Sequence, residues 1–505
     1  MLFNSYPFLL VFLPLALLGA ILARRLPGGG ERGTKVWIAF ASLVFYAWWS
    51  LDFLVILLGS ITANFGLLRL ALRQPLGSGR RKAAVATGAL LNLSLLGWFK
   101  YAGFLAFNLN ALTGAHVDVG QILLPLGISF FSFQKIALLI DVQRGDIDDI
   151  EFFDYLLFVT FFPQLIAGPI VLFTEVRPQF DSPGRLGVRW GNLAVGLSIF
   201  AIGLAKKTLI ADEMAQFATP LFDAAAKGAL LTGADAWTGA LAYAFQIYFD
   251  FSGYSDMAIG LAWMFGIALP YNFNSPYKAT SIVDFWHRWH VTLSRFLRVY
   301  LYIPLGGNRL GPARRYVNLI TVMLIGGLWH GAAWTFVVWG LLHGLYLSVN
   351  HAWRALGIAA PSARPARLLA TGASWLVTFL AVVVAWVLFR AASFESAWNI
   401  LATMFDPKAI ADMIAHGYPE KRLIPHSNVA PQELAATLAA VLVLPNTLDI
   451  LANHFPHVAG HEIANKGVLR LRWHPSTAWA GFVAACLAVG ILGLSRPQVF
   501  IYFQF

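Results

Sequence analysis

Residues 284–343 decide how this chain is organised. The stretch opens with DFWHRWHVTLSRFLR at residues 284–298 and continues with YLYIPLGGNR at residues 300–309. An apolar run then ends in GGLWHG at residues 326–331, and Trp334, Trp339 and His343 follow. Four of the twelve histidines lie within this stretch. His330 lies inside the apolar run, where an ionisable side chain is costly, so the position indicates a functional site more than a structural histidine.

The composition is that of a membrane protein. Of the 505 residues, 58% are hydrophobic and only 12% are charged, and the mean hydropathy is +0.66. Soluble domains carry about 25% charged residues. No internal repeat, low-complexity segment or dividing linker is visible. We therefore expect an all-α, polytopic transmembrane protein with a single domain over residues 1–505.

The formal net charge of +11 comes from basic residues in short loops between apolar runs. In such loops Lys and Arg set the orientation of the chain and contact lipid headgroups. No basic face with interleaved aromatic residues is present, so membrane lipids are expected partners and nucleic acid is not. The single cysteine, Cys486, excludes an intrachain disulfide and a cysteine-ligated metal cluster.

The apolar runs predict spans at about residues 7–23, 36–49, 51–68, 83–104, 193–210, 229–268, 316–339, 369–389, 433–451 and 477–494. Basic loops near residues 24–35, 69–82 and 452–474 lie in the cytoplasm by the positive-inside rule, which places both termini outside. Arg24 and Arg25 follow the first run, whereas a cleavable signal peptide has its positive charges before the run. The first run is therefore expected to remain as a span.

Two regions do not have the pattern of simple spans. Between residues 122 and 192, Pro125, Pro163 and Pro169 interrupt the apolar runs, which predicts broken or re-entrant helices around a central chamber. Residues 270–315 combine charged and aromatic side chains, as a helix at the membrane surface does. The 15 residues from Arg315 to His330 correspond to about 22 Å of helix. In a hydrocarbon core about 30 Å thick, His330 is therefore expected beyond the midplane.

Several motifs together resemble the membrane-bound O-acyltransferase family, and within it the bacterial branch of alginate O-acetyltransferase membrane subunits. These motifs are FWHRWHVTLSRFLRVYLYIPLGGNR at 285–309, LWHGAAWTF at 328–336, LPLGISFF at 124–131, DVQRG at 141–145, FFPQLIAGP at 161–169, YFDFSGYSD at 248–256 and FIYFQF at 500–505. The likeness extends over residues 1–505. It departs at Val299, where members often have Asp, and at His287, where Arg is common.

Transfer of an acyl group from a thioester to a hydroxyl requires a base for the attacking oxygen and groups that polarise the carbonyl. A neutral histidine in an apolar chamber suits the first role, and His330 is the candidate base. His290 is the candidate second group, which holds the donor or polarises its carbonyl. The resemblance implies catalytic roles for the same two histidines. Candidates for the lining of a donor tunnel are Trp286, Trp289, Arg295, Trp329 and Asp250, although tryptophans are equally typical of membrane interfaces.

Three other chemistries remain open at this point. His287 and His290 are three residues apart and could share a helix face to bind a metal, although zinc sites have firmer ligand spacing. A serine nucleophile is not favoured, because no Gly-x-Ser-x-Gly motif is present. Asp250, Asp256 and His330 would also suit an ion or proton pathway, which makes a membrane transporter the alternative from another class.

The resemblance implies a bacterial inner-membrane enzyme with periplasmic termini that moves acetyl groups from a cytoplasmic donor. The expected donor is acetyl-CoA, and no permanently bound cofactor is expected. The expected acceptor is a cell-surface polysaccharide such as alginate, reached through a periplasmic partner protein. Within the family, the alternatives are O-acetylation of peptidoglycan and D-alanyl transfer to teichoic acid. The run Tyr302–Asn308, YIPLGGN, favours the polysaccharide branch.

Overall fold

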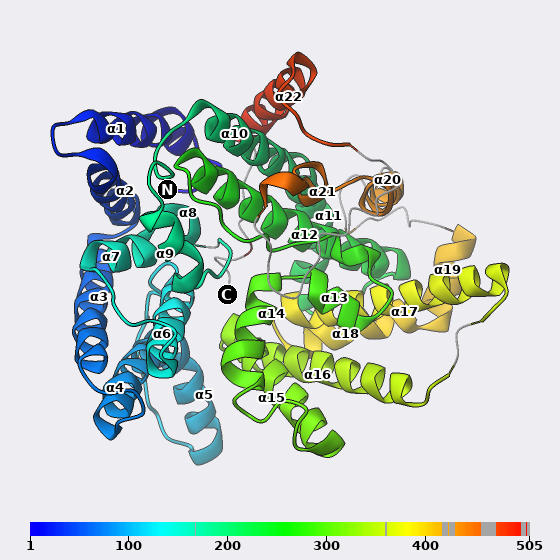
Figure 1. Cartoon of the computed structure of the whole chain (residues 1–505). Helices are drawn as coiled ribbons and strands as arrows, with labels where there is room; N and C mark the ends of the chain where they lie inside the picture. The colour runs from blue at the N-terminus through cyan, green and yellow to red at the C-terminus, as the bar shows by residue number, and fades with distance from the viewer. Residues whose placement is uncertain are drawn as a thin grey trace.

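The computed structural model describes residues 1–166, 168–358, 361–416, 423, 430–455, 471–495 and 501. All regular structure in these residues is helical, which confirms the expected all-α class (Figure 1). Of the terminal motif at 500–505, only Ile501 belongs to the described residues, and residue 167 of the motif at 161–169 lies outside them.

The first half of the chain consists of helices of different lengths, and the long helix α12 is the last of them. The elements are η1 Phe8–Phe12, α1 Leu13–Arg25, α2 Gly30–Ala47, α3 Leu51–Leu72, α4 Gly79–Leu96, η2 Gly97–Tyr101, α5 Ala102–Thr113, α6 Ile128–Arg144, α7 Phe152–Thr160, α8 Phe162–Leu165, α9 Phe173–Asp181, α10 Trp190–Ala205, η3 Lys206–Ala211, α11 Asp212–Ala226 and α12 Gly233–Met264. Helices α6 to α9 are the interrupted helices that the prolines predict between residues 122 and 192.

The second half begins with short helices and continues with three long ones. The elements are η4 Pro276–Lys278, α13 Ile282–Arg288, α14 Val291–Leu297, η5 Arg298–Tyr302, α15 Gly311–His330, α16 Trp334–Ala355, α17 Arg364–Arg390, α18 Phe394–Phe405, α19 Pro407–His416, α20 Ala430–Val443, α21 Thr447–Ile450, η6 Ala452–His454 and α22 Thr477–Gly493. The segments η1, η2, η3 and η5 are π-helical.

Hydroxyl side chains mark where several helices begin. Ser50, Ser78, Ser281 and Ser476 each precede a helix and accept a hydrogen bond from the backbone N–H three residues later, at 3.2 to 3.3 Å. Such a side chain satisfies one of the N–H groups that the first helical turn leaves unpaired. The starts of α3, α4, α13 and α22 are therefore encoded locally.

Six helical segments in the described part of the chain are long and apolar enough to cross a membrane. They are Phe8–Arg25, Leu51–Leu72, Gly79–Thr113, Trp190–Ala226, Arg364–Arg390 and Ala430–His454. They agree with six of the predicted spans, and the protein is a multi-pass membrane protein. The predicted spans at 36–49, 229–268 and 477–494 overlap helices α2, α12 and α22, and none of these three helices is among the six segments.

The predicted continuous span over residues 316–339 is wrong. Helix α15 ends at His330, Gly331 is extended with φ −160° and ψ 149°, and α16 begins at Trp334. The two helices pack side by side (Figure 1). Gly327 permits this close approach, because a Cβ there would meet the backbone of Phe336 and Gly340. The break leaves His330 at a helix end inside the molecule.

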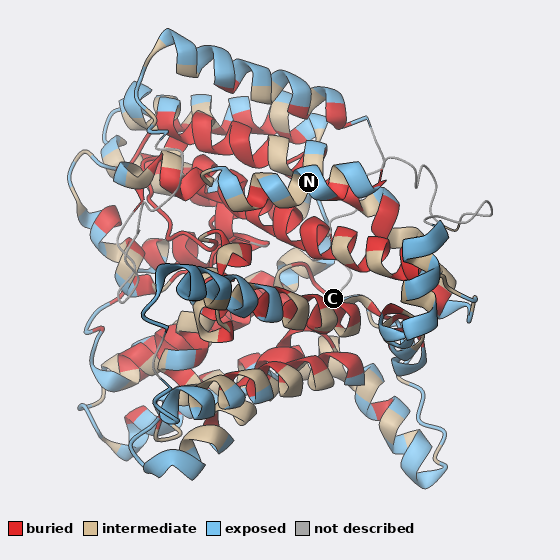
Figure 2. Ribbon diagram, turned by 90° about the vertical axis from the view of Figure 1, so that its right-hand side faces the viewer, coloured by how far each residue is buried: buried red, intermediate tan, exposed pale blue. Residues whose placement is uncertain are grey.

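Buried residues lie in the interior of the molecule, and exposed residues lie mainly on its outer helices (Figure 2). Helix α12 is buried along nearly its whole length and packs against α10, α11 and α17. The peripheral helices carry exposed apolar side chains, such as Leu51, Val55, Leu90 and Leu112. In a bilayer these side chains face lipid, since the helices satisfy their own backbone hydrogen bonds.

Candidate active site

His330 is the last residue of α15 and lies among aromatic side chains. It is 6% exposed, and its ring centroid is 4.9 Å from that of Trp329, 5.3 Å from Trp339 and 5.2 Å from Phe389. These neighbours come from helices α15, α16 and α17. The break at Gly331 is therefore what brings His330 between three helices that follow one another in the chain.

His290 lies between α13 and α14 in a left-handed backbone conformation, with φ 44°. This conformation is uncommon for residues other than glycine and marks positions that the surrounding structure holds in place. The side chain is fully buried, and its ring centroid is 6.4 Å from that of His330. The two histidines that the sequence singles out thus lie close together, although 40 residues separate them (330 − 290).

A chain of hydrogen bonds determines which nitrogen of His290 carries the proton. Thr292 Oγ1 accepts from the N–H of Ile170 at 2.9 Å and donates to Asn272 Oδ1 at 2.9 Å. The N–H of Thr292 donates to the same oxygen at 3.3 Å. His290 Nδ1 lies 3.0 Å from this acceptor and must be the donor, so the neutral ring has its lone pair on Nε2.

His343 of α16 is a third buried histidine in the same cluster. Its ring centroid lies 4.7 Å from that of Trp339, which in turn lies beside His330. Trp286 Nε1 donates to His343 Nδ1 at 3.3 Å. Because an indole N–H is only a donor, the proton of neutral His343 is on Nε2. His290 and His343 therefore present opposite hydrogen-bonding characters, an acceptor and a donor.

Four buried nitrogen atoms around His330 have no hydrogen-bond partner among the described residues. They are Nε2 of His290, Nε2 of His343, Nε1 of Trp329 and Nε1 of Trp339. Buried polar groups without a partner are rare, and each indicates a bound water, an ion or a ligand group. The cluster combines three N–H donors with one acceptor nitrogen, which suits a ligand with a carbonyl oxygen and a hydroxyl.

The three predicted tunnel tryptophans lie in or beside this cluster. Trp329 precedes His330, and its ring centroid is 6.2 Å from that of His290. Trp286 bonds His343, as described above. Trp289 is buried and stacks on Phe285 at 5.7 Å. These positions make the tryptophans part of the wall around the histidines, and their role along a donor path remains a prediction.

Arg295 and Asp250 have other partners. Arg295 forms a two-pronged ion pair with Glu175 and donates to the carbonyl of Ile170 at 3.1 Å, so it ties α14 both to α9 and to the segment before it. Asp250 of α12 pairs with Lys207 at 2.7 Å and accepts from the N–H of Ile501 at 3.0 Å. These contacts give both side chains a structural function in addition to the predicted tunnel role.

Lysines from another helical segment neutralise the buried carboxylates Asp250 and Asp256 of α12. Lys206 Nζ lies 2.6 Å from Asp256, and Lys207 pairs with both Asp250 and Asp212. Both lysines belong to η3. The pairs with Asp256 and Asp250 join η3 to α12 and could not be inferred from sequence neighbours, whereas Asp212 lies only five residues after Lys207.

The alternative in which His287 and His290 share one helix face to bind a metal is not supported by the structure. Helix α13 ends at Arg288, and His287 is exposed while His290 is buried. The left-handed conformation at His290 turns the chain between the two side chains. A metal site built on this pair is not supported by the geometry.

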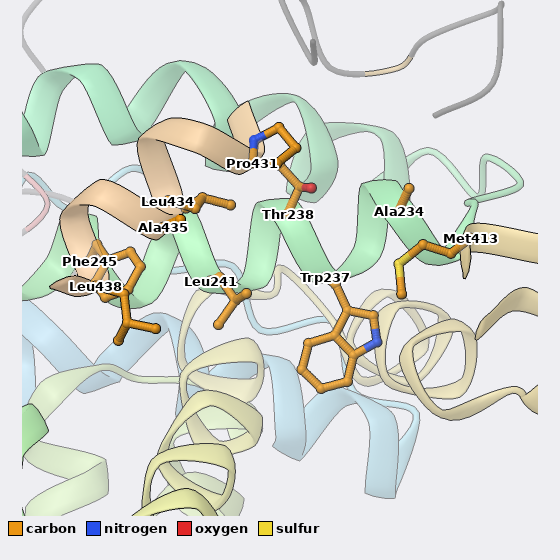
Figure 3. A pocket seen from close by; sticks show the side chains of 10 residues that line it. All are labelled: Ala234, Trp237, Thr238, Leu241, Phe245, Met413, Pro431, Leu434, Ala435 and Leu438. Carbon is orange, nitrogen blue, oxygen red and sulfur yellow. The ribbon is translucent and has the colours of Figure 1, made fainter. Parts of the chain in front are cut away.

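A separate apolar cavity lies between α12, α19 and α20 (Figure 3). It measures about 390 Å³ and is lined by Ala234, Trp237, Thr238, Leu241, Phe245, Met413, Pro431, Leu434, Ala435 and Leu438. None of the histidines of the cluster lines it. Phe245 connects the two regions, because its ring centroid is 6.2 Å from that of Tyr277, which stacks on Trp289.

Sequence reasoning did not identify Asn272, Thr292, Lys100 and Tyr101 as parts of the site. Asn272 and Thr292 orient His290, whereas Lys100 and Tyr101 bond the end of α15. Asn272 is 18 residues from His290 in the chain, and Lys100 is 230 residues from His330. No local pattern marks such partners, because the contacts exist only after the helices pack.

Many apolar helices together with two close, buried histidines among aromatic side chains are features that a membrane acyltransferase requires. The model of the family described as "MBOAT, membrane-bound O-acyltransferase family" matches residues 81–391, which include both histidines. The chain belongs to this family, and it is an O-acyltransferase.

Two groups of relatives are similar over most of the chain. The "Peptidoglycan O-acetyltransferase" of Helicobacter pylori is 44% identical over 433 residues, which is 80% of each chain. The "Probable alginate O-acetylase AlgI" of Pseudomonas aeruginosa is 43% identical over 414 residues, covering 80% of this chain and 75% of that protein. The "Teichoic acid D-alanyltransferase" of Streptococcus thermophilus is 28% identical and covers 45% of this chain.

Proposed function

We propose that this protein transfers acetyl groups from a cytoplasmic donor, acetyl-CoA, towards the O-acetylation of a cell-surface polysaccharide such as alginate. The observation that carries the proposal is the pair of buried histidines, His290 and His330, whose ring centroids are 6.4 Å apart. Beside them lie buried nitrogen atoms that have no hydrogen-bond partner among the described residues. The names of the relatives that are 40 to 44% identical support acetyl as the acyl group. A periplasmic protein completes the transfer, and the chain resides in the inner membrane with both termini in the periplasm.

In the proposed reaction His330 is the base. The acceptor hydroxyl attacks the thioester carbonyl carbon while His330 takes the hydroxyl proton. The C–S bond then breaks, and the departing sulfur receives this proton, so that an ester and a free thiol result. A positioned base of this kind typically contributes about 10²- to 10⁴-fold in rate.

The protonation of the neighbouring rings supports specific roles for them. His290 has its lone pair on Nε2, so it suits accepting a hydrogen bond from the acyl donor more than donating one to the carbonyl, while the single proton of the acceptor hydroxyl goes to His330. The N–H groups of Trp329, Trp339 and His343 suit the carbonyl oxygen, where negative charge develops during attack. The earlier alternative, in which His290 polarises the carbonyl, is therefore the less favoured of its two roles.

The test is acetyl transfer by the full chain. Radiolabelled acetyl-CoA is supplied to the protein in nanodiscs, and to inner-membrane vesicles of the source bacterium, which retain a partner protein. An acyltransferase releases free CoA and forms labelled product, with release that depends on the acceptor. Release of neither, together with movement of label or ions across vesicles, would overturn the proposal in favour of a transporter.

Peptidoglycan is the second candidate acceptor. The relative named for peptidoglycan is as similar to this chain as those named for alginate, at 44% against 43% identity. Parallel assays with alginate oligosaccharides and with peptidoglycan fragments distinguish the two. Labelling of the peptidoglycan fragments alone would reassign the acceptor without changing the reaction.

A further inference from the structure

The C-terminal end of α15 is bonded by a lysine from a distant helix. The last turn of a helix leaves carbonyl groups without intrahelical donors, and these groups must be satisfied when they are buried. The chain leaves the helical conformation at Gly331, directly after His330. The last carbonyls of α15, from Leu328 to His330, therefore need donors from elsewhere.

Lys100 and Tyr101 supply these donors. Lys100 Nζ lies 2.5 Å from the carbonyl oxygen of Trp329 and 3.0 Å from that of His330. The hydroxyl of Tyr101 donates to the carbonyl of Leu328 at 2.8 Å. Three consecutive carbonyls of the turn that carries His330 are thus held by two adjacent side chains.

Both donors come from η2, the π-helical segment between α4 and α5. Single π-helical turns inside α-helices are rare and frequently occur at functional sites. Here the π-helical turn includes both donors, so that Lys100 and Tyr101 reach the same turn of α15. The π-helical segment η2 thus supplies the hydrogen-bond donors for the C-terminal end of α15.

The lysine also suits the hydrogen bonding of a helix end. The carbonyls at the C-terminus of a helix carry partial negative charge, which favours a donor placed there. No carboxylate in the described part of the chain pairs with Lys100, whose other polar contact is Ser129 Oγ at 3.5 Å. The carbonyls of α15 are therefore the main acceptors for its amino group.

We propose that Lys100, assisted by Tyr101, is a positioning residue that holds the imidazole of His330 in place opposite His290. The inference rests on the proposed function, because it takes His330 as the base. The atoms of α15 that Lys100 bonds are backbone carbonyl oxygens, so it acts through the last turn of that helix. If that turn loosens, the ring moves, and a displacement of about 1 Å at a catalytic group can cost about 10²-fold in rate.

The test compares kcat and KM of purified variants with their melting temperatures. Lys100→Met keeps the length of the side chain but removes its donors, and we expect kcat to fall about 10- to 100-fold. The KM for the donor should change less than about threefold, because the binding groups remain. Lys100→Arg, which retains charge and donors, should restore most of kcat, and Tyr101→Phe should cost less than Lys100→Met.

Lys35→Met is the matched control. Lys35 is another largely buried lysine, paired with Asp154 at 2.8 Å in the N-terminal half. The Lys35→Met variant should have a lower melting temperature than the parent and an unchanged kcat. Normal kcat in folded Lys100→Met, or an equal loss of kcat in Lys35→Met, would overturn the positioning role. If Lys100→Met does not fold, the other two variants decide the positioning role. An unchanged kcat in Tyr101→Phe together with an inactive but folded Lys100→Arg would overturn that role.

A parent protein without acetyl transfer would instead refute the proposed function.

Discussion

Two of the three buried histidines, His290 and His343, differ in the nitrogen that carries the proton. Asn272 accepts from Nδ1 of His290, whereas Trp286 donates to Nδ1 of His343. Because the free nitrogens are therefore an acceptor and a donor, the same residue type fills two roles within one aromatic cluster. The residue that bonds Nδ1 of each ring, Asn272 or Trp286, therefore decides the role of the other ring nitrogen.

The first prediction concerns His330. Replacing His330 by Ala should lower acetyl transfer by about 10²- to 10⁴-fold, which is about 3 to 5 kcal/mol of barrier. His330→Gln keeps shape and hydrogen bonding but no basicity, so it should be nearly as inactive. Both should insert and fold, as melting temperature and membrane yield show. Cys486→Ala is the control and should retain activity.

Substantial activity in a well-folded His330→Ala protein would contradict the role of base and return the transporter to first place. Rescue by Gln alone would point to a structural histidine instead.

The second prediction concerns Asn272. Asn272→Leu removes the acceptor for His290 Nδ1–H, so the ring is free to change tautomer, and kcat should fall about 10- to 100-fold. Asn272→Asp still accepts this proton and should be less affected. Asn64→Leu is the control, since Asn64 is another buried asparagine and bonds Asn92 between α3 and α4. Equal activity of Asn272→Leu and the parent would show that the tautomer of His290 does not matter.

At the scale of elements, two neighbouring lysines of η3 hold the central helix. Lys206 pairs with Asp256 and Thr447, and Lys207 pairs with Asp212 and Asp250. Lys207 and Asp250 are each 1% exposed, so the pair is shielded from water. Glycines 196, 203, 253 and 260 let α10 approach α12 closely enough for these contacts. The buried carboxylates of α12 are thus explained by packing, without a transport pathway.

The third prediction ranks variants of this ion-pair cluster. Lys207→Met leaves two carboxylates buried without their cation, and loss of one partner of a buried pair costs about 3 to 5 kcal/mol. Asp250→Asn leaves Lys207 paired with Asp212 and retains an acceptor for the N–H of Ile501, so it should destabilise less. Melting temperatures should fall in the order parent, Asp250→Asn, Lys207→Met. A normal melting temperature combined with loss of donor binding in Asp250→Asn would instead favour the tunnel role.

At the scale of the molecule, the basic loops predict the orientation in the membrane. In a Cys486→Ala background, cysteines at Pro27 and Gly79 should be shielded from an impermeant thiol reagent in intact spheroplasts. A cysteine at Asp118, after the helical segment Gly79–Thr113, should react. All three positions are exposed in the structure, so shielding reports the membrane and not burial. The opposite labelling pattern would reverse the proposed topology.

The sequence by itself determined the class of protein and the two central residues. Low charge and long apolar runs leave no other way to satisfy the backbone in lipid than helices, so the all-α membrane fold follows from composition. His330 stood out because an ionisable group in an apolar stretch is costly. His290 stood out because it belongs to the Trp-His motif on which the family resemblance rests. Serine caps also fixed several helix starts, since capping is local.

Only the tertiary structure decided how the site is assembled. The break after His330 depends on α16 packing against Gly327, and the apolar run at 316–339 carries no sign of it. Asn272 and Lys100 became partners of the histidines because distant segments meet in the fold. The hydrophobic pattern of a sequence indicates which face of a helix is buried. It does not indicate which buried groups face one another, and the chemistry of this site depends on those contacts.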